Sequence, residues 1–227
     1  MKKRIIFDIE TGSLPFDKIA EVAPDFDPDS VKVGNLGIEK GMEKINEAKR
    51  SHMESIESKA ALNAEYGTVL AIGIQDESGQ TLLVGGNAEA EVEILEEFWT
   101  LVEDSYGRTG EFWIGHNILN FDLPFLLRRS MLLGVPVPRQ LVPQFRYWPQ
   151  DFWVDTFQIW AAGDWKKFVS LNHLCRSFGL PGKNGSGARF QELFEDPKTH
   201  DESIEYLKND IQITYDVSMK MLNCLYS

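Results

Sequence analysis

Short apolar runs and longer amphipathic stretches alternate along this chain. Runs of strand length occupy residues 5–7, 68–74, 81–84, 112–115 and 152–154. Runs of this length bounded by turn residues are typical of buried strands. A polar turn at residues 76–80 separates the second run from the third, so these two predict a β-hairpin. Gly12 follows the first run closely, and we expect the first strand to end there.

Apolar residues at helical spacing follow several of these runs. The clearest case is residues 88–104, where they recur at Val92, Leu95, Phe98, Trp99 and Val102, which predicts a helix with one apolar face. Similar patterns predict helices over residues 122–133, 156–162, 170–178 and 202–225. Three strands come first, and strands then alternate with helices. This order predicts an α/β fold with a mixed central sheet flanked by helices.

Residues 13–66 interrupt this alternation. Their first part, to about residue 29, is polar and rich in Pro and Asp, and residues 40–60 form a charged pattern that predicts an exposed helix. The whole stretch holds too few large apolar residues for a core of its own. We therefore expect a single domain, residues 1–227, with a helical insertion at 13–66 after the first strand.

The composition is ordinary for a globular protein. With 227 residues, 43% of them hydrophobic and 26% charged, the chain is long enough for one sizeable core. It has no run of about 18 apolar residues that would predict a membrane span, and its basic N-terminus lacks the apolar core of a signal peptide. Cys175 and Cys224 are the only cysteines, which supports neither a disulfide framework nor a thiolate metal site. These features predict a cytoplasmic protein without a membrane partner.

The charge is strongly negative but unevenly distributed. The formal net charge of −12 argues against indiscriminate nucleic-acid binding. Residues 121–190 nevertheless hold nine Lys or Arg and four acids, so this stretch carries +5 and the rest of the chain −17. Such asymmetry favours one face that tolerates phosphates. A chance excess of surface cations would give the same count.

Asp8 and Glu10 come at the end of the first predicted strand. Residues two apart on a strand point to the same face, so two carboxylates project together from a core strand. Acids placed there usually pair with cations or hold metals, because uncompensated buried charge is unfavourable. Mg2+ sites use a few carboxylates together with water and phosphate oxygens. A solvated strand end is the alternative for this pair taken by itself.

Two further predicted elements downstream carry acids that could join Asp8 and Glu10. Asp122 opens a predicted helix just beyond a strand, where an Asp would also serve as a helix cap. Tyr206 and Asp210 are four apart in the last predicted helix, so they lie on one face. A hydrogen bond between these two side chains on the helix surface is the alternative there.

Together these elements resemble the tyrosine branch of the DEDD-type 3′–5′ exonuclease superfamily, which has an RNase H-like fold. The three motifs of that superfamily are Asp-x-Glu on a strand, Asn followed by aromatic-Asp, and Tyr-x-x-x-Asp. The resemblance is closest to the proofreading exonuclease domain of family B DNA polymerases and its stand-alone relatives, and it covers the chain apart from residues 13–66. The residues that match here are Asp8, Glu10, Asn117, Phe121, Asp122, Tyr206 and Asp210.

The resemblance implies a catalytic site with two divalent metal ions, Mg2+ or Mn2+. By that resemblance Asp8 bridges both ions, Glu10 and Asp210 complete the more tightly held site, and Asp122 supports the other, mostly through water. Tyr206 would orient the attacking water. Such a site fits phosphodiester hydrolysis, which needs charge stabilised on both the attacking and the leaving oxygen.

The resemblance also implies contacts with the substrate. The backbone around Thr11 would cradle the 3′-terminal nucleotide, Asn117 would contact its sugar or phosphate, and Phe121 would stack nearby, although core packing explains Phe121 equally well. Cations interleave with aromatic residues between positions 145 and 168, a mixture that suits single strands. The cations proposed to contact phosphates are Arg146, Lys166 and Lys167.

Three positions near these motifs have simpler explanations. We expect His116 to be a hydrogen-bonded structural residue. Asp155 should cap a helix, with a supporting role in the site as the alternative. The Gly-rich stretch at residues 182–187 lacks the ending of a phosphate-binding P-loop, and we expect a loop there that touches the nucleic acid.

The sequence therefore predicts a metal-dependent 3′–5′ exonuclease that acts on single-stranded DNA ends and releases nucleoside monophosphates. A preference for RNA stays open, as does a non-catalytic binding module that keeps the fold. A phosphatase of the haloacid-dehalogenase kind, with Asp8 as nucleophile, is poorly matched because Glu10 and Gly12 replace residues of its motif. Because the chain ends soon after the third motif, we expect any polymerase or other replication or repair partner to act in trans. A free-standing trimming nuclease is the alternative.

Overall fold

The computed structural model describes residues 3–106, 111–143, 152–164, 169–182 and 187–225. The chain divides into two compact units. The larger one comprises residues 1–11 and 69–227, and the smaller one comprises residues 12–68. The division falls close to the insertion expected from the sequence, and each unit is described below by itself.

The larger unit is built on a mixed sheet, which has five strands among the described residues in the order β3-β2-β1-β4-β5. β2 and β3 form the predicted antiparallel hairpin, with Ile72 opposite Leu83. β4 pairs in parallel with β1 on one side and with β5 on the other. The strands are β1 (Arg4–Ser13), β2 (Gly67–Asp76), β3 (Gly79–Val84), β4 (Phe112–Gly115) and β5 (Trp153–Asp155).

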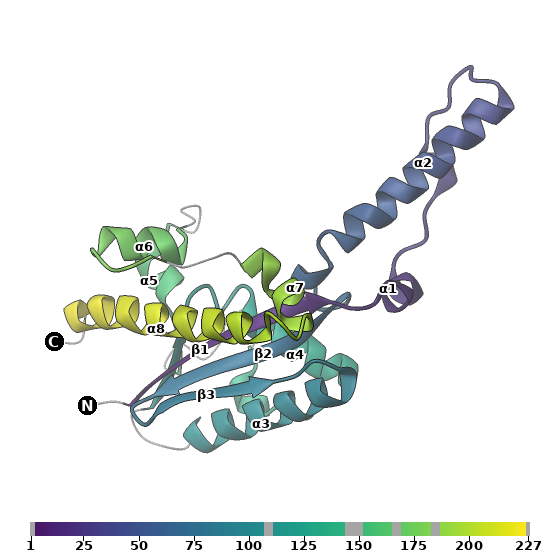
Figure 1. The fold of residues 1–227 in the computed structure, drawn as a ribbon. Coiled ribbons are helices and arrows are strands. Elements are labelled where there is room, and N and C mark those ends of the chain that lie inside the picture. The colour runs from purple at the N-terminus through teal and green to yellow at the C-terminus, as the bar shows by residue number, and fades with distance from the viewer. Residues whose placement is uncertain (1–2, 107–110, 144–151, 165–168, 183–186, 226–227) are drawn as a thin grey trace. The chain divides into compact units, whose positions relative to one another are not determined.

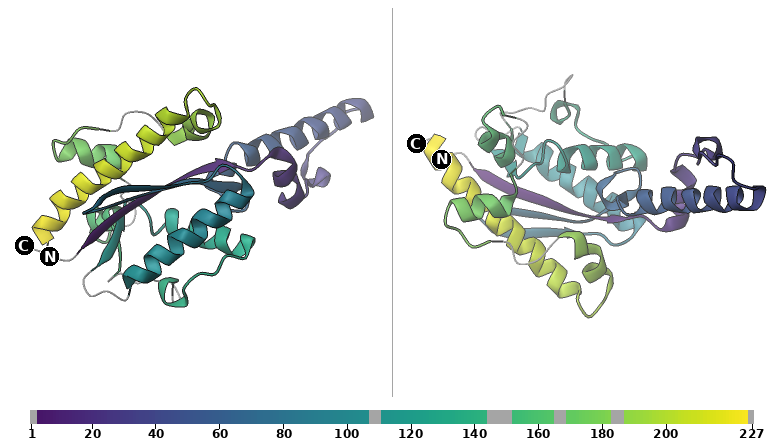
Figure 2. Two further views of the ribbon diagram at one scale, coloured as in Figure 1. Left: turned by 60° about the horizontal axis from the view of Figure 1, so that its bottom comes forward. Right: turned by 90° about the horizontal axis from the view of Figure 1, so that it is seen from above.

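Helices cover both faces of this sheet (Figure 1). α3 (Ala88–Tyr106) and α4 (Asp122–Leu133) lie on one face, and α8 (His200–Leu225) crosses the other, as a second view shows (Figure 2). α8 packs against three shorter helices, α5 (Thr156–Ala161), α6 (Leu171–Ser177) and α7 (Phe190–Glu195). The predicted α/β architecture is thus confirmed.

Alternation along β1 decides which side chains meet which helices. Phe7 points into an aromatic core with Phe98 of α3 and Trp113 of β4, at ring-centre distances of 5.6 and 5.7 Å. Its neighbour Ile6 belongs instead to the apolar cluster that contains Leu207 of α8. Because side chains alternate along a strand, the even-numbered residues of β1 face α8.

A glycine lets α8 approach the sheet closely. A Cβ on Gly73 of β2 would collide with the side chain of Ile211 in α8. Only the absence of a side chain at position 73 therefore allows this packing. Ile211 follows Asp210 directly, so the close approach also holds the Asp210 region of α8 down on the sheet.

Within the sheet and the helices around it, the structure differs from the sequence-based expectation in three places. β1 does not end at Gly12 but continues to Ser13, because the Gly12 backbone stays extended and pairs as a strand. α7 was not predicted, since its six residues are too few to show a helical period. The short 3-10 turn at Gly187–Arg189 occupies the end of the expected Gly-rich loop.

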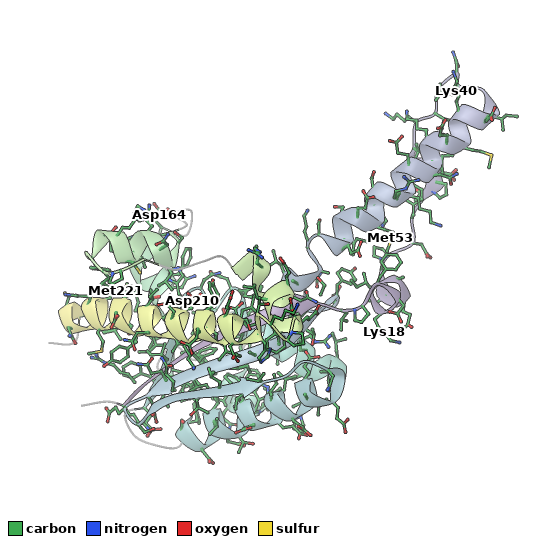
Figure 3. The ribbon with its side chains drawn as sticks, in the orientation of Figure 1. Lys18, Lys40, Met53, Asp164, Asp210 and Met221 are labelled. Carbon is green, nitrogen blue, oxygen red and sulfur yellow. The ribbon has the colours of Figure 1, made fainter. Side chains whose placement is uncertain are left out.

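The smaller unit contains the predicted exposed helix, α2 (Ile38–Glu57), and a short helix, α1 (Phe16–Val22). The segment before α2 runs back along it: the Phe26 and His52 rings are 5.8 Å apart, and the Lys44 ammonium donates to the Lys32 carbonyl at 2.7 Å. Gly41 is the one buried position of this fully described helix. Figure 3 labels Lys40 and Met53 on it.

None of the helices within the described ranges is long and apolar enough to cross a membrane. Cys175 is buried, Cys224 is exposed, and neither forms a disulfide bond.

A buried ion pair joins the two helices on the α3 face. The Arg129 guanidinium of α4 donates to both carboxylate oxygens of Glu91 in α3, each at 2.8 Å. The same Glu91 carboxylate accepts the backbone N–H of Val69 in β2 at 2.9 Å. Both side chains are almost completely buried, so each charge depends on its partner.

We expect Glu91→Gln to lower the free energy of unfolding by about 3–5 kcal/mol, because it removes the carboxylate charge that pairs with the buried Arg129 guanidinium. Urea titration followed by circular dichroism measures this loss. Glu192→Gln, which removes an exposed ion pair with Arg189, is the matched control and should change little. Equal losses in the two variants would contradict a special role of the buried pair.

Candidate active site

Three carboxylates from β1 and α8 converge on one point. Among the described residues, Asp8, Glu10 and Asp210 each offer an oxygen within 4.8 Å of the others. Asp210 is 1% exposed and Glu10 8%, whereas Asp8 is half-buried. The even-numbered face of β1 and the close approach of α8 at Gly73 together produce this convergence. Figure 3 labels Asp210 on α8, the helix that supplies the third acid.

This cluster is suited to a hard divalent cation. Carboxylates held this close repel one another unless a positive charge lies between them. An all-oxygen donor set matches Mg2+ or Mn2+, and it does not suit metals that prefer sulfur or imidazole. Asp8, Glu10 and Asp210 could therefore hold one such ion.

Asp122 approaches the same region from α4. It is the first residue of that helix, yet no side chain caps the helix, and Phe121 occupies the N-cap position. The Asp122 carboxylate instead accepts the backbone N–H of Ile9 at 3.3 Å and is 3% exposed. Asp122 is thus not the N-cap residue of α4, and its side chain is directed at β1.

The environment of Asp122 strongly disfavours its charge. Burial raises the pKa of the Asp122 carboxyl well above its usual range, and the nearby charge of Asp8 raises it further, with a smaller effect from Asp155. Hydrogen bonds from the backbone N–H groups of Asp122 itself and of Ile9 act to lower this pKa. Asp122 thus belongs electrostatically to the group around Asp8, although it lies outside the tight three-residue cluster.

Tyr206 lies one turn before Asp210 on α8, half-buried, with its ring 6.2 Å from that of Phe190. A Cβ built on Gly187 would lie 3.5 Å from the Tyr206 hydroxyl and 3.9 Å from Oε2 of Glu10. The Gly187 backbone therefore borders the space that these two groups share. Sequence reasoning included Gly187 only as part of a Gly-rich stretch and did not single it out.

The loop before Asp122 has an unusual backbone. Asn117 adopts a left-handed conformation with φ of 67°, one of two non-glycine residues with positive φ in the described chain. Asn tolerates this conformation better than most residues. Its side-chain oxygen accepts a hydrogen bond from Asn120 at 2.9 Å. Phe121, half-buried, packs its ring 5.6 Å from that of Phe125.

Asp155 closes β5 directly beside this loop. It is the N-cap of α5, as predicted, and accepts the Phe157 N–H at 2.9 Å. It also accepts the N–H groups of Asn117 and Leu119. Burial raises the pKa of the Asp155 carboxyl even though these hydrogen bonds act to lower it.

His116 uses both ring nitrogens within the protein. Nδ1 lies 3.0 Å from the Thr156 hydroxyl and Nε2 lies 3.0 Å from the Val169 carbonyl. These contacts fit the expected structural role and tie the start of the loop to the first residue of α5 and to the segment before α6.

The remaining predicted substrate contacts are less well placed by the structure. Thr11 is half-buried on β1, next to Glu10. Arg146, Lys166 and Lys167 lie outside the described residues. Of the nearby aromatic residues, Phe152, Trp153 and Phe157 are core residues, whereas Trp160 is 41% exposed and packs on Phe178.

Comparisons with known proteins agree with this geometry. Residues 61–224 match a family described as predicted 3′–5′ exonucleases related to the exonuclease domain of PolB. The chain belongs to this family. The matched residues include the second motif, which ends at Asp122, and the third motif, Tyr206 and Asp210. Asp8 and Glu10 of the first motif precede the matched residues.

The family B DNA polymerase of the hyperthermophilic archaeon Pyrobaculum calidifontis has a similar structure, with a TM-score of 0.61 and 17% sequence identity. The superposition covers 98% of the present chain and 25% of the polymerase. At this identity the likeness establishes the fold, which is that of a PolB exonuclease domain, RNase H-like as expected. No curated protein sequence matches this family member.

The raised pKa of Asp122 predicts an unusual pH dependence in metal-free protein. A carboxyl whose pKa is higher in the folded state stabilises the fold below its unfolded pKa of about 3.9, and this contribution is lost as the pH rises through the folded pKa. In EDTA, Asp122→Asn should therefore gain in Tm over the wild type as the pH is raised from about 4 to 8.

The measurement is a series of thermal melts at constant ionic strength. Asp216→Asn, the same change at an incompletely buried position of α8, is the matched control. A Tm difference for Asp122→Asn that does not change with pH would show that Asp122 is not held in an unfavourable environment.

Proposed function

We propose that this member of the exonuclease family hydrolyses single-stranded DNA from its 3′ end and releases nucleoside monophosphates. The observation that carries the proposal is the convergence of Asp8, Glu10 and Asp210, with Asp122 beside Asp8. These four acids come from three separated segments, and their oxygens share one region of the larger unit. A cluster of this kind has no stabilising role in the fold without cations.

Two divalent metal ions, when bound, would stabilise the negative charge that develops on the attacking and leaving oxygens of the phosphodiester. Asp8, Glu10 and Asp210 would hold one ion, and Asp8 with Asp122 would hold the other. Burial and the charge of Asp8 raise the pKa of Asp122, and a bound cation would favour its charged form instead.

Tyr206 would position the water that attacks the phosphorus. A phenol ordinarily ionises only near pH 10, so at neutral pH it orients water by hydrogen bonding and is a poor general base. The Tyr206 hydroxyl and the Glu10 carboxylate both border the place next to Gly187. A water between them would contact a metal ligand and the phenol at once.

The substrate side of the proposal rests on residues around this centre. The Thr11 backbone and the Asn117 side chain would hold the terminal nucleotide, with Phe121 beside it. Arg146, Lys166 and Lys167 would meet phosphates further along the strand. Because the chain carries a net charge of −12, we also propose that a polymerase or another replication or repair protein recruits it to DNA ends.

The decisive experiment uses a 5′-labelled single-stranded DNA oligonucleotide with Mg2+ or Mn2+. Wild-type protein should produce a ladder that shortens from the 3′ end, and EDTA should abolish it. Asp210→Asn removes a proposed ligand and should lower the rate by roughly a thousandfold or more. Asp216→Asn, the same change on the same helix, should retain the wild-type rate.

A matching RNA oligonucleotide and a 3′-blocked DNA belong in the same experiment. Shortening of RNA with DNA left intact would move the proposal to an RNA exonuclease. Binding of either strand without shortening would support a non-catalytic module instead. Unchanged activity in Asp210→Asn would refute the proposed site.

The role of Tyr206 can be separated from that of the acids. Tyr206→Phe should lower kcat by on the order of ten- to a hundredfold, because it removes only the hydroxyl that orients water. Gly187→Ala should lower kcat to a similar degree, because its methyl would touch both the hydroxyl and Glu10. Gly187→Ala should not shift the Tm by more than a degree or two, since the contacts made by its methyl are of ordinary van der Waals length. Wild-type kcat in both variants would place the attacking water elsewhere.

A further inference from the structure

Asp155 accepts more hydrogen bonds than a helix cap requires. Its Oδ1 accepts the Phe157 N–H that caps α5, at 2.9 Å, and the same oxygen accepts the Asn117 N–H at 2.7 Å. Its Oδ2 accepts the Leu119 N–H at 3.1 Å. The side chain thus binds a loop almost forty residues earlier in the chain, in addition to its own helix.

Capping by itself does not explain a carboxylate at this position. Asp155 is 3% exposed, and burying a charge is unfavourable unless the hydrogen bonds it receives compensate for it. α6 shows the simpler solution, because the exposed Ser170 hydroxyl caps it by accepting a single N–H, that of His173. The additional bonds at Asp155 go to the loop between β4 and α4.

The strand register brings Asp155 to this loop. β4 and β5 pair in parallel with Gly115 opposite Asp155, so both strands end at the same level. The chain leaving Gly115 then turns at Asn117, whose carbonyl accepts the N–H groups of Asn120 and Phe121, each at 3.1 Å. This turn leads directly into Asp122.

The left-handed backbone of Asn117 needs support from outside the loop. A non-glycine residue in this region has a conformational cost of about 1 kcal/mol or more, and it persists where its surroundings hold it in place. The hydrogen bond from the Asn117 N–H to Asp155 is such a support. The Leu119 N–H also donates to this carboxylate, which is a second hydrogen bond between Asp155 and the turn.

We propose that Asp155 is a positioning residue of the active site: by holding the 117–121 turn, it sets where Asn117 faces the nucleic acid and where Asp122 enters the metal site. This inference rests on the proposed exonuclease function. Asp155 itself touches neither the substrate nor the ions in this scheme.

Two variants separate capping from loop anchoring. Asp155→Asn keeps one side-chain oxygen, which can still accept the N–H groups of Asn117 and Phe157. Its NH2 group replaces the oxygen that accepts the Leu119 N–H, so two hydrogen-bond donors would face each other there. Asp155→Ser keeps a cap for Phe157, as Ser170 does for α6, and is too short to hold the loop. Ser170→Ala, which removes a cap without any loop contact, is the control.

Amide hydrogen exchange by NMR on metal-free protein tests the anchor directly. In Asp155→Ser, the amides of Asn117 and Leu119 should exchange at least about tenfold faster while that of Phe157 stays protected. In Asp155→Asn, the increase among the loop amides should be confined to Leu119. Ser170→Ala should leave the loop amides unchanged. Unchanged protection of Leu119 in both Asp155 variants would overturn the proposal.

Kinetics on single-stranded DNA tests the consequence. Asp155→Ser should lower kcat by on the order of ten- to a hundredfold and raise the Mg2+ concentration needed for half-maximal rate, as is usual when a supporting partner of a metal site is lost. Ser170→Ala should match the wild type in both. Wild-type kcat and Mg2+ dependence in Asp155→Ser would overturn the proposal even if the loop amides were released.

Thermal melts with and without Mn2+ test the role of Asp155 separately from nuclease activity. The wild type and Ser170→Ala should gain in Tm when Mn2+ is added, and Asp155→Ser should lose most of that gain because Asp122 is misplaced. This result would support the positioning role even if the wild type degraded neither DNA nor RNA. An equal Mn2+ gain in Asp155→Ser would count against it.

Discussion

The mutual repulsion of carboxylates is the constraint on which this structure depends. Asp8, Glu10 and Asp210 bring their oxygens within 4.8 Å of one another, and Asp122 is buried next to Asp8. Each acid would be more stable in water, so the fold must hold all of them against a cost that bound cations would offset. The surrounding packing is best understood as the framework that keeps these groups together.

That framework consists of the packing on the two faces of the sheet. On the α8 side, the missing side chain of Gly73 allows Ile211 to reach the sheet, which fixes the height of the helix that carries Asp210. On the α3 side, an aromatic core around Phe7 and the buried pair of Glu91 and Arg129 lock α3 and α4 to the sheet. β1 contributes to both faces, because its odd residues enter one core and its even residues carry the acids. Sites built on packed strands and helices hold their geometry better than sites built on loops.

The second motif is the exception, since it lies on a loop. Its turn is held from outside by Asp155 and by the contacts of His116 with Thr156 and Val169. Sequence reasoning recognised a helix cap at Asp155 and a structural residue at His116, yet it had no means of showing that both hold the same turn. It likewise took Asp122 for a potential cap, because an acid at the start of a helix has the same pattern in either role.

The sequence by itself determined the order of strands and helices and the acids they carry. Side-chain alternation in strands and the four-residue spacing in helices are local rules, and Asp8, Glu10, Tyr206 and Asp210 follow them. Only the tertiary structure decided that Asp122 points at β1, that the Gly187 backbone borders the Tyr206 hydroxyl, and that Asp155 holds the 117–121 turn. These contacts join distant segments largely through backbone N–H groups, which nearly every residue has, and through a missing side chain, which every glycine has. They therefore leave no pattern in the sequence, and the packing of β4, β5 and α8 around β1 is what creates them.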